Sequence, residues 1–146
     1  SAASDVYKRQ KDTYAGKCPY HANCLEGLAS GPAVEARWGR PAKELADRED
    51  VWEMEAFYLA EAVANYVLTY SPQKIVLWGG IMHQSQLFSM VRTKVQELLG
   101  GYISNEKILK EIDTYLVPPA LGENPGIMGA FALGMREAEY RKPKEA

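Results

Sequence analysis

The sequence predicts an α/β fold in which helices cover a small, incomplete sheet. Segments with helical spacing of apolar residues alternate with two short continuous apolar runs, residues 75–78 and 114–117, and a glycine-rich turn follows each run. This alternation is typical of α/β architecture. Two strands are too few for a self-sufficient sheet. We therefore expect the remaining strands to come from elsewhere.

Short helices are expected in the first third of the chain. Asn23 is placed to cap one of them, because its side chain accepts a hydrogen bond from a helix N–H. Pro32 suits the first turn of the next helix, because N–H groups in the first turn have no hydrogen-bond partner within the helix. The expected short helices are residues 24–30, 32–38 and 42–46.

The two strongest helix signals frame the first strand. Residues 51–70 carry apolar side chains at helical spacing up to Ser71-Pro72, and residues 84–99 do so up to Gly100-Gly101. Smaller helices are expected at 105–112 and 127–140.

Both runs predict strands. Residues 75–78 (Ile-Val-Leu-Trp) are continuously apolar and rich in β-branched residues, which predicts a strand buried on both faces. Residues 114–117 (Thr-Tyr-Leu-Val) predict a second strand that ends before Pro118-Pro119.

Composition excludes several classes of protein. A net charge of −2, with 47% hydrophobic and 25% charged residues, describes an ordinary globular chain with no basic footprint for nucleic acid. No apolar stretch approaches the roughly 20 residues that span a bilayer. Two cysteines do not make a disulfide framework. We expect a cytoplasmic protein with no nucleic-acid or membrane partner.

Residues 1–10 differ in character from the rest of the chain. They lack an initiator Met and show neither helical nor strand periodicity. We interpret them as a foreign or processed leader, with a native disordered arm as the alternative, and place the domain at residues 11–146.

Both cysteines lie in residues 18–24 (Cys-Pro-Tyr-His-Ala-Asn-Cys). Cys18, His21 and Cys24 offer two thiolates and an imidazole at three-residue spacing, a donor set that suits Zn²⁺. A closed structural site has four protein ligands, and this segment supplies three. Three interpretations follow. The segment is part of a larger structural zinc site, or it is an open catalytic zinc site with Glu26 as general base. The third is that it binds no metal and is a chance cluster or a Cys18–Cys24 disulfide.

Two glycine-rich turns are candidates for phosphate contact. Gly79 and Gly80 follow the first strand, and residues 122–126 (Gly-Glu-Asn-Pro-Gly) precede the last helix. Backbone N–H groups at such turns can receive phosphate, although strand-to-helix turns also need glycine for conformational reasons alone. Glu26 is placed to bind hydroxyl groups of a small ligand, with a solvated surface residue as the alternative. His83 is expected in a surface loop.

Three segments together resemble the carboxyl-terminal half of the ROK family of sugar kinases, and most closely its bacterial fructokinase branch. They are Cys18-x-x-His21-x-x-Cys24-Leu25-Glu26 with the following Ser-Gly-Pro-Ala, residues 75–81 (Ile-Val-Leu-Trp-Gly-Gly-Ile), and residues 121–130 (Leu-Gly-Glu-Asn-Pro-Gly-Ile-Met-Gly-Ala). The resemblance extends from Lys11 to the end. Trp78 departs from it, standing where many members have the first glycine of a Gly-Gly-Gly turn, and Glu123 and Pro125 replace the commoner Asp and Ala.

The resemblance implies a two-lobed, actin-like (ribonuclease-H-like) ATPase fold, of which this chain is the carboxyl-terminal lobe. It implies phosphoryl transfer from Mg·ATP to a hexose, here fructose, by a homodimer with a structural zinc whose fourth ligand is an upstream His. The catalytic Asp base, the phosphate loop and a Glu-x-Gly-His sugar motif belong to the missing half, so we expect this chain alone to be inactive. Glu26 matches the sugar-contacting glutamate. The nucleotide side would be formed by Gly79, Gly80, Gly122, Asn124 and Gly126.

Two other functions stay open. One is the sugar-binding half of a ROK-type transcriptional repressor, which a helix-turn-helix in the upstream sequence would indicate. The other is a zinc hydrolase that uses Glu26, which metal-free protein would exclude.

Overall fold

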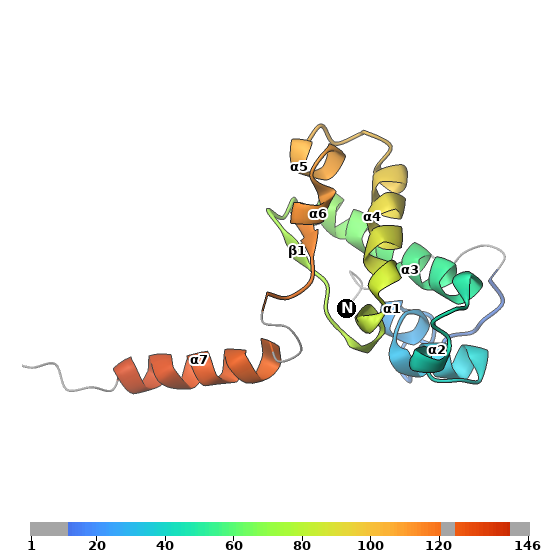
Figure 1. Ribbon diagram of the computed structural model, residues 1–146, viewed down its shortest axis with the longest axis horizontal. Helices are drawn as coiled ribbons and strands as arrows, with labels where there is room; N and C mark the ends of the chain where they lie inside the picture. Colours follow the sequence, from blue (N-terminus) through green and yellow to red (C-terminus); the bar gives the residue numbers. More distant parts are fainter. Residues whose placement is uncertain (1–11, 121–124, 141–146) are drawn as a thin grey trace, which may run out of the picture.

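The computed structural model describes residues 12–120 and 125–140. Helices α3 and α4 pack side by side at its centre, α1 and α2 lie at one end of α3, and the strands with α5 and α6 lie at the other (Figure 1). In chain order the elements are α1 (Leu25–Leu28), α2 (Gly31–Trp38), the 3-10 helix η2 (Ala42–Glu44), α3 (Glu49–Tyr70), β1 (Ile75–Val76), the 3-10 helix η3 (Gly80–His83), α4 (Ser85–Leu99), α5 (Glu106–Leu109), α6 (Ile112–Tyr115), β2 (Leu116–Val117) and α7 (Pro125–Tyr140).

The core forms between α3 and α4, the two helices that the periodicity predicts most clearly. Every fourth residue of α4 from Leu87 onward is buried, so that one stripe faces α3. From α3, Trp52 and Tyr58 are buried, and the Trp52 indole N–H donates to the Leu45 carbonyl over 2.8 Å. The rest of α3 contributes many small and branched side chains: Val51, Ala56, Leu59, Ala60, Ala62, Val63, Ala64 and Val67.

The sheet consists, in the described residues, of two short parallel strands. Ile75 pairs with Leu116 and Val76 with Val117, and the Leu77 N–H extends the ladder by donating to the Val117 carbonyl over 3.0 Å. The prediction of a strand buried on both faces is wrong for β1, because Val76 is 54% exposed. A sheet of only two strands has edges and faces that no neighbouring strand or helix covers, which explains the exposure of Val76.

Several predicted boundaries move. Residues 114 and 115 are not strand but the end of α6, where the Thr114 hydroxyl donates to the Glu111 carbonyl and the Tyr115 hydroxyl to the Pro72 carbonyl. Asn23 does not cap α1, whose N-cap is Cys24 without a side-chain hydrogen bond. The expected helix at 105–112 divides into α5 and α6. The other expected helices are found, and η3 is an additional 3-10 helix that the sequence did not predict.

A buried ion pair ties the segment before the metal motif to α2 and α3. Arg37 donates two hydrogen bonds to Asp12, of 2.6 and 3.1 Å, and the Tyr14 N–H and the Tyr58 hydroxyl donate to the same carboxylate. Burial alone would raise the pKa of Asp12, but these hydrogen bonds and the Arg37 charge outweigh it and lower that pKa. Asp12 is therefore a buried anion.

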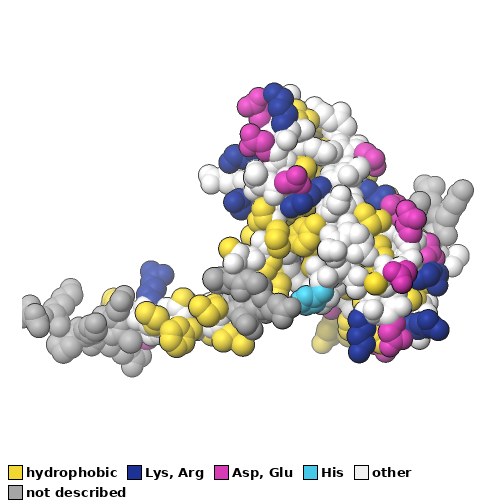
Figure 2. Space-filling view, in the orientation of Figure 1, with side chains coloured by type: hydrophobic (Ala, Val, Ile, Leu, Met, Phe, Trp, Pro, Cys, Tyr) yellow, Lys and Arg dark blue, Asp and Glu magenta, His cyan; other side chains and the backbone are white. Residues whose placement is uncertain are grey.

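Helix α7 confirms the helix expected at 127–140 and starts slightly earlier. It points away from the rest of the described structure (Figure 1), and apolar side chains lie exposed along it (Figure 2). Ile127, Phe131 and Leu133 are each at least 65% exposed. No helix among the described residues has the length and apolar character needed to cross a membrane. The predicted leader, residues 1–10, lies outside the described residues.

Candidate functional site

The metal motif forms a tight loop before any ion is considered. The Cys18 N–H donates to the Ala22 carbonyl over 3.2 Å, and the Ala22 N–H returns a bond of 2.9 Å to the Cys18 carbonyl. Ala22 adopts a left-handed φ of 49°, which reverses the chain between the two cysteines. The Lys17 N–H donates to the Gly27 carbonyl over 2.9 Å and fastens the loop to α1.

Two glycines let this loop close, and sequence reasoning missed both. A Cβ on Gly27 would lie 1.8 Å from the Ala22 carbonyl oxygen, and one on Gly16 would lie 2.1 Å from the same atom. Gly16 also has a φ of 89°, which favours glycine. No spacing rule identifies such residues, because the clash depends on how the loop folds back onto α1.

The three predicted ligands converge. One ligand atom each from Cys18, His21 and Cys24 lies within 4.8 Å of the others, and Cys18 Sγ is 4.0 Å from His21 Nδ1. Zinc bonds of about 2.3 Å to sulfur and about 2.0 Å to nitrogen place neighbouring tetrahedral ligands about 3.5–4 Å apart. Small side-chain movements therefore suffice to bind Zn²⁺, and the donor set suits that ion.

Electrostatics and exposure also suit a metal. Backbone N–H groups of His21 and Tyr20 lower the pKa of the Cys18 thiol, which favours the thiolate that binds metals. Cys24 is buried, Cys18 is half-buried and His21 is exposed. The site is thus open on the histidine side, where a further ligand can approach.

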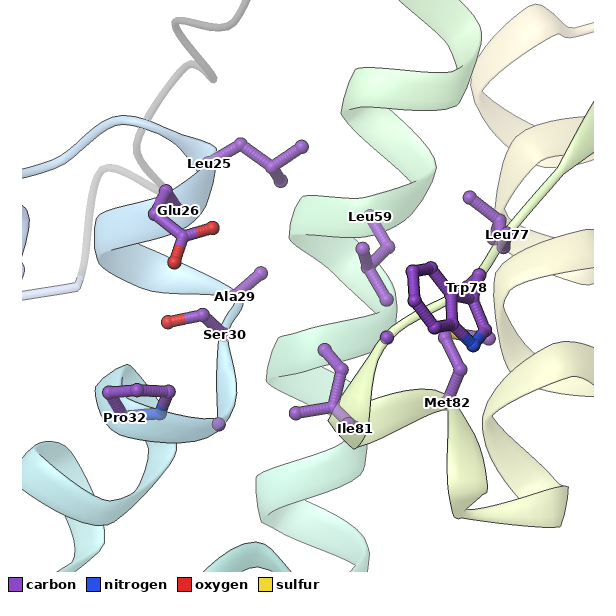
Figure 3. A pocket seen from close by; sticks show the side chains of 13 residues that line it. Leu25, Glu26, Ala29, Ser30, Pro32, Leu59, Leu77, Trp78, Ile81 and Met82 are labelled. Carbon is purple, nitrogen blue, oxygen red and sulfur yellow. The ribbon is translucent and has the colours of Figure 1, made fainter. Parts of the chain in front are cut away.

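Glu26 lies on α1, directly beyond the metal loop, and lines a cavity of about 550 Å³. Its carboxylate faces Leu59 of α3 across this cavity (Figure 3). The opposite wall comes from the β1–η3 turn, which includes Gly79 and Gly80. The complete lining is Leu25, Glu26, Ala29, Ser30, Gly31, Pro32, Leu59, Leu77, Trp78, Gly79, Gly80, Ile81 and Met82.

Of the residues predicted to contact the nucleotide, the structure describes Gly79, Gly80 and Gly126. Gly79 has a φ of 146° and ψ of 169°, a conformation that side chains rarely adopt. Between this turn and α4 lies the 3-10 helix η3, an element that the sequence did not predict. Gly126, in the first turn of α7, is close to the Trp78 ring, because a Cβ there would lie 4.0 Å from it. Gly122 and Asn124 lie outside the described residues.

His83 is exposed, as expected, but it lies in the 3-10 helix η3 and not in a loop. Among the aromatic side chains of α3, Trp52 and Tyr58 belong to the core, and Phe57 and Tyr66 pack against it.

The cavity between Glu26 and the Gly79–Gly80 turn lies beyond the end of a parallel strand, which is where α/β proteins commonly bind ligands, and it is the candidate site of this chain. The chain belongs to the ROK family, whose model matches residues 7–137. The match covers the metal loop, the cavity and most of α7.

Similar proteins and structures agree with this assignment. A Bacillus subtilis (strain 168) protein named "Putative fructokinase" is 47% identical over 88% of this chain and 43% of its own length. The Pediococcus pentosaceus fructokinase is 43% identical over 84% of this chain and 41% of its own length. The chain thus spans less than half of these relatives.

The structure of a ROK hexokinase from Thermus thermophilus aligns with a TM-score of 0.65 at 20% identity, over 92% of this chain and 48% of that protein. The fold is therefore that of the ROK sugar kinases, the actin-like ATPase fold predicted from the sequence motifs.

Proposed function

We propose that this chain is the carboxyl-terminal lobe of an ATP-dependent hexose kinase that converts fructose to fructose 6-phosphate. The observation that carries the proposal is that Glu26 and the Gly79–Gly80 turn line one cavity of about 550 Å³. That volume lies within the range of small-molecule sites. The names of the curated relatives support a kinase, and fructose as its substrate, over a repressor or a hydrolase.

On the acceptor side, Glu26 accepts hydrogen bonds from hexose hydroxyl groups and orients the sugar. Cys18, His21 and Cys24 would hold a structural Zn²⁺, together with a histidine upstream of this chain. When bound, the ion supplies a rigid cross-link rather than a reacting group. Because α1 begins at Leu25, immediately after Cys24, the cross-link would determine where Glu26 points.

On the donor side, we assign Gly79, Gly80 and Gly126 to contact with Mg·ATP, along with Gly122 and Asn124. When bound, Mg²⁺ neutralises charge on the phosphates. Glycine at these places allows the backbone to approach the phosphates closely. The catalytic Asp is assigned to the upstream lobe, and since phosphoryl transfer depends on positioning by the whole cleft, this chain alone is expected to be inactive.

We further propose that the full-length kinase is a cytoplasmic homodimer without nucleic-acid or membrane partners. The resemblance to ROK kinases supports the dimer. The need for two free thiolates in the metal loop supports a reducing compartment.

A chimera tests this function. The amino-terminal lobe of the Pediococcus pentosaceus fructokinase is joined to residues 12–146 of this chain, and ATP-dependent phosphorylation of fructose, mannose and glucose is measured. We expect activity that is greatest with fructose. Glu26→Gln should lower kcat/KM for fructose about 10- to 100-fold, the effect of weakening hydrogen bonds to a charged group.

The matched control is Glu35→Gln, which changes an exposed glutamate on α2 outside the cavity and should leave kcat/KM unchanged. A folded, zinc-loaded chimera without activity on any of the three hexoses would refute the proposed function. Full activity of the Glu26→Gln chimera would refute the role of Glu26.

A further inference from the structure

Trp78 is exposed in a way that its neighbours do not explain. Of the three tryptophans of the chain, Trp52 is buried and Trp38 is partly buried, whereas Trp78 is 59% exposed. Large aromatic side chains are usually buried for most of their surface. Trp78 lies two residues after β1 and directly before Gly79, whose φ of 146° favours glycine.

Trp78 lines two cavities. One is the cavity of Glu26, shown with the Trp78 ring in Figure 3. The other is a slot of about 170 Å³, whose walls are mainly rings and apolar side chains. The slot is lined by Leu77, Trp78, Gly79, Met82, His83, Phe88, Pro118 and Pro119.

The size and chemistry of the slot indicate its occupant. It is smaller than the roughly 300 Å³ at which sites for whole ligands begin, so it suits one flat ring system that forms part of a larger ligand. Flat apolar walls favour stacking. Among the described residues that line it, only His83 and the indole of Trp78 carry polar side-chain atoms, and this leaves few groups to recognise one base edge.

We propose that Trp78 is the stacking platform for the base of the nucleoside triphosphate donor, and that it lets this site accept several bases. The proposal rests on the proposed kinase function. Gly79 lines both cavities, so a donor with its base in the slot extends its phosphates past Gly79 toward Glu26 and the acceptor sugar. Every base has a π-face, so stacking tolerates a change of base.

Calorimetric titration of the 146-residue chain with the Mg²⁺ complexes of ATP, GTP, CTP, UTP and inorganic tripolyphosphate tests the proposal. We expect ATP and GTP to bind with similar Kd and the pyrimidine nucleotides within about tenfold of them. Trp78→Gly should weaken all four nucleotides about tenfold, the lower part of the range for stacking one base, and leave tripolyphosphate unchanged. Trp78→Phe should restore binding, whereas Trp78→Leu, which has bulk without a π-face, should not.

The kinase chimera supplies the second measurement, in which the same variants should change KM for the donor and leave KM for fructose unchanged. If the chimera phosphorylates fructose but Trp78→Gly binds nucleotides as well as or better than the unaltered chain, the stacking proposal is wrong and the kinase function stands. Equal rescue by Leu and Phe, or selectivity for ATP beyond a hundredfold, also overturns it. If the chimera is inactive and the chain binds no nucleotide, both proposals fail together.

Discussion

Replacing Glu55 with glutamine is expected to remove most of the pH dependence of stability between pH 5 and 8. Glu55 lies on α3 with 0% exposure, and neither of its carboxyl oxygens has a hydrogen-bond partner among the described residues. Burial raises the pKa of Glu55 from 4.5 to about 8; Arg37 opposes the rise and the Asp12 carboxylate adds to it. The folded chain therefore keeps a proton on Glu55 that the unfolded chain releases above pH 4.5.

The sign and size come from proton linkage. Between pH 4.5 and 8 the folded state binds more protons than the unfolded state, so stability falls as pH rises. Each pH unit costs about 1.4 kcal/mol, and from pH 5 to pH 8 this amounts to about 4 kcal/mol. That is a large share of the 5–15 kcal/mol that usually stabilises a domain.

The assay is urea unfolding of the unaltered chain and Glu55→Gln at pH 5, 6, 7 and 8, at equal metal content. All other titrating groups contribute equally to both proteins, so the difference between them isolates Glu55. We expect this difference to change by about 4 kcal/mol across the series, with glutamine relatively better at high pH. Parallel curves for the two proteins would show that Glu55 is ionised in the folded state and would refute the reasoning.

Gly27→Ala should weaken zinc binding about 10- to 100-fold in a chelator competition, because a Cβ 1.8 Å from the Ala22 carbonyl oxygen forces the metal loop open. Gly31→Ala, where a Cβ meets nothing within 4 Å, should bind zinc normally, and equal affinities would count against a steric role for Gly27. Arg37→Met should lower the free energy of unfolding by about 3–5 kcal/mol, since it leaves a buried carboxylate without its cation. Arg48→Met, which breaks an exposed ion pair, should cost less than about 1 kcal/mol by the same urea titration, and similar losses in the two variants would contradict this explanation. Removing zinc with a chelator should leave the far-UV circular dichroism of the helices nearly unchanged, whereas proteolysis of the metal loop should accelerate. Global unfolding on zinc removal would contradict the expectation that the α3–α4 core is stable without the ion.

Helical periodicity predicted α3 and α4 well because each buries one face against the other, so the pattern that specifies the helix also specifies its partner. Leu87, Val91 and Val95 illustrate this, since their spacing and their burial coincide. The convergence of Cys18, His21 and Cys24 was predictable for a similar reason: three side chains within seven residues leave the chain few ways to arrange them.

The strands were harder, because their length depends on residues far away in the sequence. Thr114 and Tyr115 have the composition of a strand but form the end of α6, held by the bond from the Tyr115 hydroxyl to the Pro72 carbonyl. Similarly, nothing in the local sequence reveals that Gly27 must pass close to the Ala22 carbonyl, or that Glu55 has no hydrogen-bond partner within the part of the chain that the structure describes. These features arise only when separate segments meet.

The ion pair between Asp12 and Arg37 has a practical consequence for dissecting this molecule. A shortened gene product that begins at Tyr14 would retain Cys18, His21 and Cys24 and the whole cavity, so the sequence alone would favour that starting point. It would also lack the Asp12 carboxylate, so the buried Arg37 would lose its ion-pair partner and the Tyr58 hydroxyl would lose the acceptor of its hydrogen bond. Glu55, whose pKa responds to the charges of both Arg37 and Asp12, would be affected as well. A version shortened from the amino terminus should therefore keep Asp12, which lies several residues before the first motif that stands out in the sequence.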